Sequence, residues 1–186
     1  YKQIERLDSV STIADGIAVK QPGENTFNFC SKYVDGIVTV TDDEVSSAIL
    51  SMLEHQKIIT EGAGAVAAAA VMFDKIPVKG KNVICVVSGG NIDVTILSRV
   101  IKRGLLMSGR SCQLMIELMD KPGQLKHVSR IIADLGGNVT SVHHERANEG
   151  SDVNGCYLRI ILETRNYEHI AQIKQALTDY GFKLLD

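Results

Sequence analysis

The stretch Val83-Ile84-Cys85-Val86-Val87-Ser88-Gly89-Gly90-Asn91 decides the fold of the first half of this chain. Its five leading residues are all apolar, a pattern typical of a parallel strand buried on both faces. A helical pattern follows, with apolar positions at Ile92, Ile96, Leu97, Val100 and Ile101. This unit predicts an open α/β sheet. Because ligands bind such sheets at the carboxyl ends of strands, and glycines allow close approach, Ser88 and its neighbours are a candidate ligand site.

Composition excludes several classes of function. The chain has 186 residues, 45% hydrophobic, with a net charge of −2. The lysines and arginines are scattered, so we expect no nucleic-acid partner. The longest apolar stretch, residues 63–73, is too short to span a bilayer, so we expect no membrane partner. Four cysteines without a Cys-x-x-Cys pair predict reduced thiols in a cytoplasmic protein. The first residue is not Met, which predicts a fragment.

Further elements are predicted around the opening stretch. Thr26 is expected to cap a short helix, and residues 36–40 are expected to form a short strand. Thr41 and Glu44 match a capping box that opens a helix to about Gln56. The segment Thr60-Glu61-Gly62-Ala63-Gly64 leads into a tightly packed alanine-rich helix. The helix after the opening stretch is expected to end near Gly104.

The pattern changes after a predicted linker at residues 106–111, which separates a domain at 1–105 from one at 112–186. We expect a strand at 112–119, a turn at 120–123, a helix at 124–135, strands at 138–146 and 155–164 around a polar hairpin loop, a helix at 167–180 and a last strand at 182–185. The order βαββαβ is that of the ferredoxin-like split unit.

The second half resembles the ACT domain, a small regulatory module that binds amino acids. The matching residues are Leu114-Met115-Ile116-Glu117-Leu118, Asp120-Lys121-Pro122-Gly123 and Gly136-Gly137-Asn138-Val139.

The first half resembles the threonine/serine dehydratases, pyridoxal phosphate (PLP) enzymes of the three-layer fold shared with tryptophan synthase β. Four segments match in the family's order, and they are Thr12-Ile13-Ala14-Asp15-Gly16, Val38-Thr39-Val40-Thr41-Asp42-Asp43-Glu44, Thr60-Glu61-Gly62-Ala63-Gly64 and Ser88-Gly89-Gly90-Asn91-Ile92-Asp93. The fold class implied is α/β, a partial PLP-dependent domain followed by a ferredoxin-like ACT domain.

The resemblance implies cofactor roles for five residues. Ser88 would hydrogen-bond the pyridine nitrogen of PLP, whereas its alternative role is a turn after a strand. Gly89, Gly90 and Asn91 would shape the pocket floor, although Asn91 could instead only cap the next helix. Glu61 would face the cofactor or substrate, and its alternative role is a helix cap.

The resemblance also implies what these residues lack. The family's Schiff-base lysine, in a Ser-x-Lys-x-Arg-Gly setting, and its glycine-rich phosphate loop have no counterpart here. The sequence therefore predicts no catalytic residue in this chain and no turnover by it alone. Half of a doubly wound sheet would also expose apolar surface at residues 83–87 and 65–73.

In the second half, free backbone N–H groups at the start of the predicted helix favour an amino-acid carboxylate. The predicted effector-binding residues are Asp120, Gly123, Gln124, Leu125 and, by resemblance from a neighbouring ACT domain, Asn138. Isoleucine or valine is the expected effector, and a homo-oligomer through the ACT domain is expected. The alternatives are a capped turn without ligand and a domain that serves only assembly.

No metal site is predicted. Asp15 alone is a poor set of ligands, and Ser11 precedes Thr12 where some relatives have a carboxylate. His143 and His144 are adjacent on a strand, so their side chains point to opposite faces.

The expected reaction of the intact enzyme is β-elimination. It removes the α-proton of threonine or serine, expels the β-hydroxyl and yields 2-oxobutanoate or pyruvate with ammonia. Isoleucine biosynthesis is the expected setting. The alternative function is a stand-alone amino-acid sensor or oligomerisation module.

Overall fold

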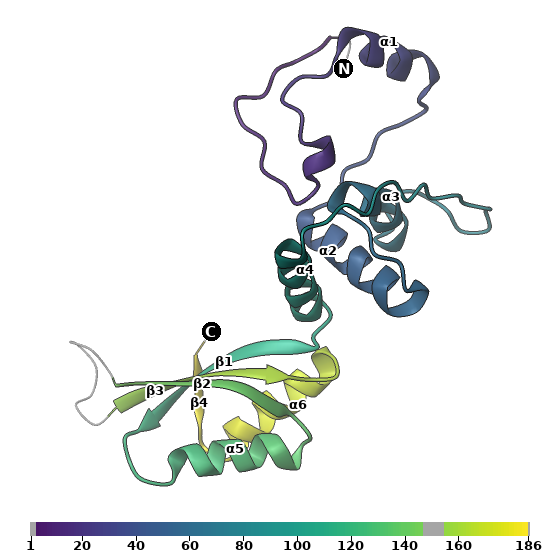
Figure 1. The fold of residues 1–186 in the computed structure, drawn as a ribbon. Helices are drawn as coiled ribbons and strands as arrows, with labels where there is room; N and C mark the ends of the chain where they lie inside the picture. Colours follow the sequence, from purple (N-terminus) through teal and green to yellow (C-terminus); the bar gives the residue numbers. More distant parts are fainter. Residues whose placement is uncertain (1–2, 147–154, 186) are drawn as a thin grey trace. The chain divides into compact units, whose positions relative to one another are not determined.

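The computed structural model describes residues 3–146 and 155–185. The chain divides into two compact units, Tyr1–Gly104 and Leu105–Asp186 (Figure 1). Among the residues described, no helix is long and apolar enough to cross a membrane. All four cysteines lie in the described part, and none forms a disulfide.

The first unit is helical. Its elements are the 3-10 turn η1 (Asp15–Ile17), α1 (Glu24–Tyr33), α2 (Asp42–Ser51) continued by the π-helical turn η2 (Met52–Gln56), α3 (Gly62–Met72) and α4 (Val94–Met107), whose last residues belong to the second unit.

The start of α2 confirms the predicted capping box. Glu44 N donates to Thr41 Oγ1 at 3.3 Å, and Thr41 N donates to Glu44 Oε2 at 2.8 Å. The helical path continues through η2 to Gln56, as predicted, and ends where Lys57 adopts a left-handed conformation with φ 59°. The start of α1 differs from the prediction, because Gly23 is the N-cap and Thr26 Oγ1 instead donates to Gly23 O at 2.8 Å.

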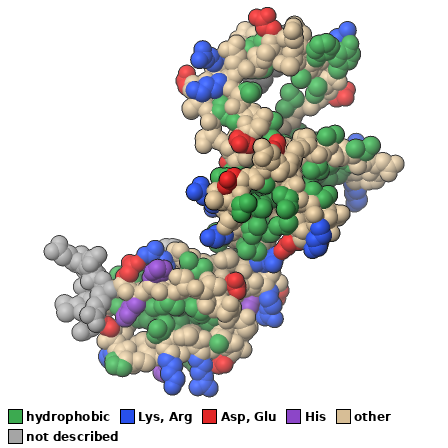
Figure 2. Space-filling model, in the orientation of Figure 1, with side chains coloured by type: hydrophobic (Ala, Val, Ile, Leu, Met, Phe, Trp, Pro, Cys, Tyr) green, Lys and Arg blue, Asp and Glu red, His purple; other side chains and the backbone are tan. Residues whose placement is uncertain are grey.

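The predicted strands at residues 36–40 and 83–87 are wrong, because the described residues of the first unit contain no β-strand. Ile84 is 92% exposed and Val86 72%. A strand needs neighbouring strands to pair its backbone groups, and neither run has one. The expected exposure of residues 83–87 is therefore confirmed, and Figure 2 shows apolar side chains on the visible face of this unit.

The core of the first unit lies among its helices. Ala65 and Ala69 of α3 are fully buried and share a core with Ile49 of α2. The outer end of α3 is exposed at Met72 and Phe73, so the exposure expected for residues 65–73 holds only there. The remaining buried members of this core are Val45, Ala48, Met52 and Val100.

Helix α4 passes through Gly104, so the predicted helix end there is wrong. Gly104 is buried, and a Cβ on it would lie 3.0 Å from Leu50 Cβ. The glycine therefore serves close packing against α2 and does not end the helix.

The second unit confirms the βαββαβ prediction. Its elements are β1 (Ser111–Met119), α5 (Gln124–Asp134), β2 (Asn138–Arg146), β3 (Gly155–Glu163), α6 (Tyr167–Asp179) and β4 (Lys183–Leu185). The sheet order is β2-β3-β1-β4 with every pair antiparallel, which is the ferredoxin-like order. The predicted hairpin loop at 147–154 lies outside the described residues.

Helices α5 and α6 cover one face of this sheet (Figure 1). Strand β3 alternates between buried and half-buried residues, and Ile160 is fully buried beneath the helices. A β-bulge interrupts β2 between Val139 and Ser141, where Thr140 Oγ1 donates to Ile161 O at 3.1 Å. The other fully enclosed members of this core include Ile116, Val128, Ile132, Leu162, Ile173 and Leu177.

Candidate functional site

Three of the sequence segments converge in the first unit. They surround a cavity of about 670 Å³. Its lining residues come from residues 12–15, from the entrance of α3 and from the segment before and within α4, and they are Thr12, Ile13, Asp15, Glu61, Gly62, Asn91, Ile92, Asp93, Val94, Ile96 and Val100. The motifs that match in chain order thus also meet in space.

Glycines make this convergence possible. A Cβ on Gly62 would overlap the Ile13 carbonyl, and one on Gly64 would overlap the Ser88 carbonyl. Gly89 adopts φ +85°, and a Cβ there would press into the Glu61 carboxylate. Each glycine therefore lets the backbone of one motif approach another motif closely.

Thr60 fixes the contact between two of the motifs. It is fully buried, and its Oγ1 donates to Gly89 O at 2.9 Å. Glu61 N also donates to Gly89 O, at 3.3 Å. A buried hydroxyl is stable only with such a partner, so Thr60 holds the Ser-Gly-Gly-Asn segment against the start of α3. The sequence does not predict this role of Thr60, since nothing in a single threonine distinguishes it before the fold is known.

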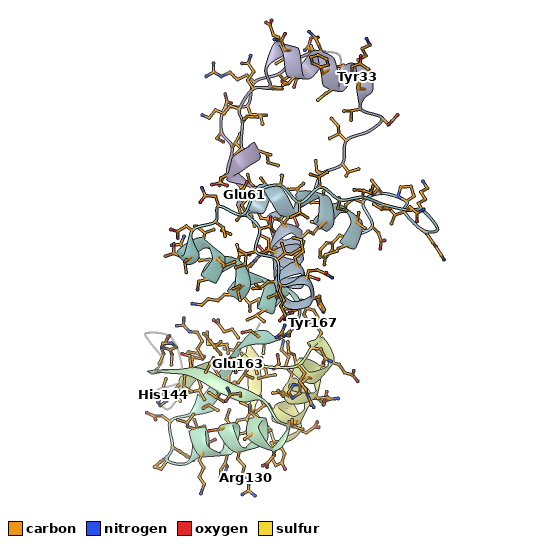
Figure 3. All side chains as sticks on the ribbon, turned by 45° about the vertical axis from the view of Figure 1, so that its right-hand side comes forward. Tyr33, Glu61, Arg130, His144, Glu163 and Tyr167 are labelled. Atoms are coloured by element: carbon orange, nitrogen blue, oxygen red, sulfur yellow. The ribbon has the colours of Figure 1, made fainter. Side chains whose placement is uncertain are left out.

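Glu61 occupies the N-cap position of α3, but its side chain makes no capping hydrogen bond. It is half-buried and lines the cavity (Figure 3). Its carboxylate lies against Gly89 instead of against the helix N-terminus. The capping alternative considered from sequence is therefore not what the side chain does.

Asn91 also lines the cavity, and Asp93 takes the capping role at α4. Asp93 Oδ1 accepts from Thr95 N at 2.7 Å and from Ile96 N at 3.4 Å. The hydrogen bond from the Thr95 hydroxyl, followed by those backbone bonds, holds the pKa of Asp93 below its ordinary value. Asn91 is thus left facing the cavity.

Ser88, Gly89 and Gly90 are exposed and lie beside the cavity without lining it. The structure brings Glu61 and Asn91 to one surface and places Gly89 next to Glu61. It does not bring the Ser88 side chain into that cavity. The cofactor roles of all five residues stay predictions.

The segment at residues 12–16 is held by the start of α2. Thr12 Oγ1 donates to Asp42 Oδ1 at 2.5 Å, and Ile13 N donates to the same oxygen at 3.3 Å. Asp42 is the first residue of α2, so its carboxylate ties this wall of the cavity to the start of that helix.

In the second unit, the predicted effector residues mostly meet. Asp120, Gly123, Gln124 and Leu125 line a small cavity at the start of α5, and Gly123 is the N-cap with φ +92°. Asn138 is the first residue of β2, whereas the cavity lies near the last residues of that strand. Asn138 Nδ2 donates to Glu163 Oε2 at 2.8 Å. Within one chain Asn138 is not part of this cavity.

Two family profiles match different parts of the chain. The profile described as "Pyridoxal-phosphate dependent enzyme" matches residues 1–89, and the profile described as "ACT domain" matches residues 113–181. Residues 1–89 are therefore similar to part of a PLP-dependent enzyme domain, and residues 113–181 are similar to an ACT domain.

Curated relatives are similar to this chain over nearly its whole length. The chain is 44% identical over 180 residues to an L-threonine ammonia-lyase of Thermotoga maritima, covering 97% of this chain and 45% of the relative. It is 40% identical to an L-threonine ammonia-lyase of Geobacter sulfurreducens, again over 97% and 45%. A biosynthetic L-threonine dehydratase of Halalkalibacterium halodurans is 30% identical over 97% of this chain and 43% of the relative. The chain thus spans less than half the length of these relatives.

Proposed function

We propose that this chain is the C-terminal portion of a threonine ammonia-lyase. The intact enzyme would convert threonine to 2-oxobutanoate and ammonia, or serine to pyruvate and ammonia. The observation that carries the proposal is the convergence of residues 12–15, 61–62 and 91–93 at one cavity, beside which the hydrogen bond from Thr60 Oγ1 to Gly89 O holds residues 88–90. The similarity over 97% of the chain to proteins named L-threonine ammonia-lyase supports it.

The residues present suit the pyridine end of PLP. Ser88 is exposed, so its hydroxyl is accessible to a ring nitrogen. Glycine at position 89 leaves space beside the Glu61 carboxylate that a side chain would fill. Ser88 would hold the nitrogen, Gly89, Gly90 and Asn91 would form the floor, and Glu61 would face the ring or the substrate. When bound, PLP supplies an electron sink for the substrate α-carbon.

The hydroxyl of Ser88 sets the electronic character of such a site. A hydroxyl at the ring nitrogen does not hold the ring protonated as a carboxylate would, which suits β-elimination. No lysine among the 186 residues lies in a Ser-x-Lys-x-Arg-Gly sequence, the setting of the family's Schiff-base lysine. We therefore predict that this chain alone gives no turnover.

The test measures threonine turnover by the complete product of the natural gene. We expect 2-oxobutanoate from threonine. Ser88→Ala should lower kcat by about tenfold or more, since one lost hydrogen bond is worth about 1.5 kcal/mol, and should shift the PLP absorbance. Ser31→Ala, at an exposed position on α1, is the matched control. The proposal fails if threonine gives no 2-oxobutanoate, or if the two variants behave alike.

We propose further that the ACT domain binds a feedback amino acid, isoleucine or valine, at Asp120, Gly123, Gln124 and Leu125. Backbone N–H groups at the start of α5 suit its carboxylate. Asn138 of a second copy would complete the site, in a homo-oligomer formed through the ACT domain. Similarity to a biosynthetic L-threonine dehydratase supports a biosynthetic role. Reduced cysteines suit a cytoplasmic location.

Calorimetric titration tests this regulation. We expect saturable binding of isoleucine or valine that Gly123→Ala weakens, because φ +92° strains any side chain there. Gly136→Ala is the matched control, since it carries equal backbone strain at φ +85° away from the cavity. Equal affinity in both variants would contradict the placement of the effector.

A second candidate function is an amino-acid sensing or assembly module without turnover. The completeness of the second unit favours it, because its sheet and core come from residues 105–185 alone. Effector binding without any turnover by the natural gene product would select this function.

A further inference from the structure

Asp120, His144 and Cys156 come together at one end of the second unit. Their ligand atoms, one from each side chain, all lie within 4.8 Å of one another. The three residues come from the turn after β1, from β2 and from β3. Because each is on a different element, no local spacing in the sequence announces the cluster.

The strand register explains the convergence. Cys156 pairs with Leu118 of β1, and His144 pairs with Leu158 of β3. Paired residues share a face, and residues two apart on one strand share a face, so His144 and Cys156 lie on the same side of the sheet. Leu158 and Leu118 are buried beneath the helices, which makes this the helix-covered face. Figure 3 shows His144 at the end of that sheet.

The cluster lines a cavity of about 90 Å³ that the start of α5 also borders. Cys156 is only 1% exposed, whereas Asp120 and His144 are exposed. The thiol therefore forms the inner wall, and the imidazole and carboxylate form the entrance. A water molecule occupies about 30 Å³ in the liquid, so the space suits an ion with a bound water.

The chemistry of the three groups is specific. A thiolate, an imidazole and a carboxylate are the donors that zinc takes, and three protein ligands leave a fourth position for water. Hard cations such as Ca²⁺ and Mg²⁺ instead require oxygen ligands. Ligand atoms around a tetrahedral zinc ion lie about 3.5 Å apart, so small side-chain rotations would close this cluster around one ion.

We propose that Asp120, His144 and Cys156 bind a thiophilic divalent transition metal ion of the zinc type. On binding, the thiol of Cys156 gives its proton to solvent, and the thiolate, a neutral ring nitrogen of His144 and the Asp120 carboxylate coordinate the metal. This goes beyond the proposed ammonia-lyase function and does not depend on it. The ion would share Asp120 and the cavity at the start of α5 with the proposed effector site. It differs from the sequence prediction of no metal site, which considered only residues within one segment at a time.

Co²⁺ and Zn²⁺ added to the metal-free full chain test the proposal. We expect one Co²⁺ per chain, with a thiolate-to-cobalt charge-transfer band in the near ultraviolet and visible bands of tetrahedral intensity. Zn²⁺ should displace it. Loss of an outer-shell partner costs about 10–100-fold in metal affinity, so loss of a direct ligand should cost about 100-fold or more.

Two ligand variants and two controls decide the outcome. Cys156→Ser should abolish the charge-transfer band, and His144→Gln, at an exposed position, should weaken binding without endangering the fold. His143→Gln and Cys112→Ser should leave binding unchanged, because His143 pairs with Arg159 on the other face and Cys112 lies at the far end of β1. Absence of the band, or equal loss in His143→Gln and His144→Gln, would overturn the assignment. Threonine turnover is measured separately and bears only on the ammonia-lyase proposal.

Discussion

Residues 83–87 of the first unit and residues 160–162 of the second are both apolar runs with β-branched side chains. The second run lies within β3, paired with β1 on one side and β2 on the other, and Ile160 is fully buried. The first run has no strand beside it, and Ile84 is 92% exposed. Similar composition thus gives a core strand in one unit and an exposed segment in the other.

The difference lies in whether the neighbouring strands come from the same stretch of sequence. All four strands of the sheet in the second unit come from residues 111–185, so each backbone group of β3 finds its partner within the same short stretch. Side-chain preference for strands reflects fit to a half-buried surface more than an intrinsic preference of the backbone. Residues 83–87 have that composition but receive no such surface from the described part of the first unit.

The largest expected effect contrasts these two runs directly. Ile160→Ala should lower the free energy of unfolding of the second unit by about 2–5 kcal/mol, since it leaves a cavity in the core. Ile84→Ala should change stability by less than about 0.5 kcal/mol. Urea denaturation with hydrogen exchange of the β1 and β3 amides resolves both. Equal losses would mean that residues 83–87 are buried in solution.

A smaller effect concerns the glycines that let the motifs meet. Gly64→Ala should destabilise the first unit by about 1–3 kcal/mol, because the new methyl group would overlap the Ser88 carbonyl. Gly36→Ala is the control, since nothing lies within 4 Å of its position. Thermal unfolding checks both. If Gly64→Ala is as stable as Gly36→Ala, residues 60–64 do not pack on the Ser-Gly-Gly-Asn segment.

The smallest expected effect is a difference between the two units in how their stability depends on pH. The hydrogen bond that Arg103 donates to Asp43 lowers the pKa of Asp43 in the first unit. The hydrogen bond that Lys183 donates to Glu117 raises the pKa of Lys183 in the second. The Asp43 contribution is present above its unfolded pKa and lost as pH falls through its folded value. The Lys183 contribution is present below its unfolded pKa and lost as pH rises through its folded value.

Asp43→Asn should therefore flatten only the acid side of the stability profile, below about pH 4, and Lys183→Met only the alkaline side, above about pH 10. Both pairs are exposed, so each change should be small. Unfolding measured across pH checks the assignment, and an acid effect of Lys183→Met would contradict it.

Local patterns explain which parts of the fold could be predicted. The second unit follows from periodicity and from turn residues such as Gly123 and Gly136, and its helices and strands begin or end within a residue or two of prediction. The capping box at Thr41 likewise encodes the start of α2 locally. Gly104 could not be read correctly, because its role depends on contact with Leu50 across the unit.

The residues of the candidate sites likewise fall into those that local sequence patterns predict and those that only the fold reveals. Glu61 and Asn91 were predicted from the resemblance of the segments that contain them, and both line the cavity. Thr60 was missed because a hydrogen bond to Gly89, 29 residues away, leaves no trace in the sequence. The meeting of Asp120, His144 and Cys156 depends on the register of three strands, which no single strand reveals.

The bulge in β2 has a consequence for the two adjacent histidines. With strict alternation from Val139, which faces the core opposite Leu162, the next inward positions would be Ser141 and His143. The extra residue Thr140 changes that count, so Val142 and His144 face inward instead. A single-residue insertion in a nine-residue strand thus selects which imidazole faces Cys156, and deleting Thr140 would exchange the two.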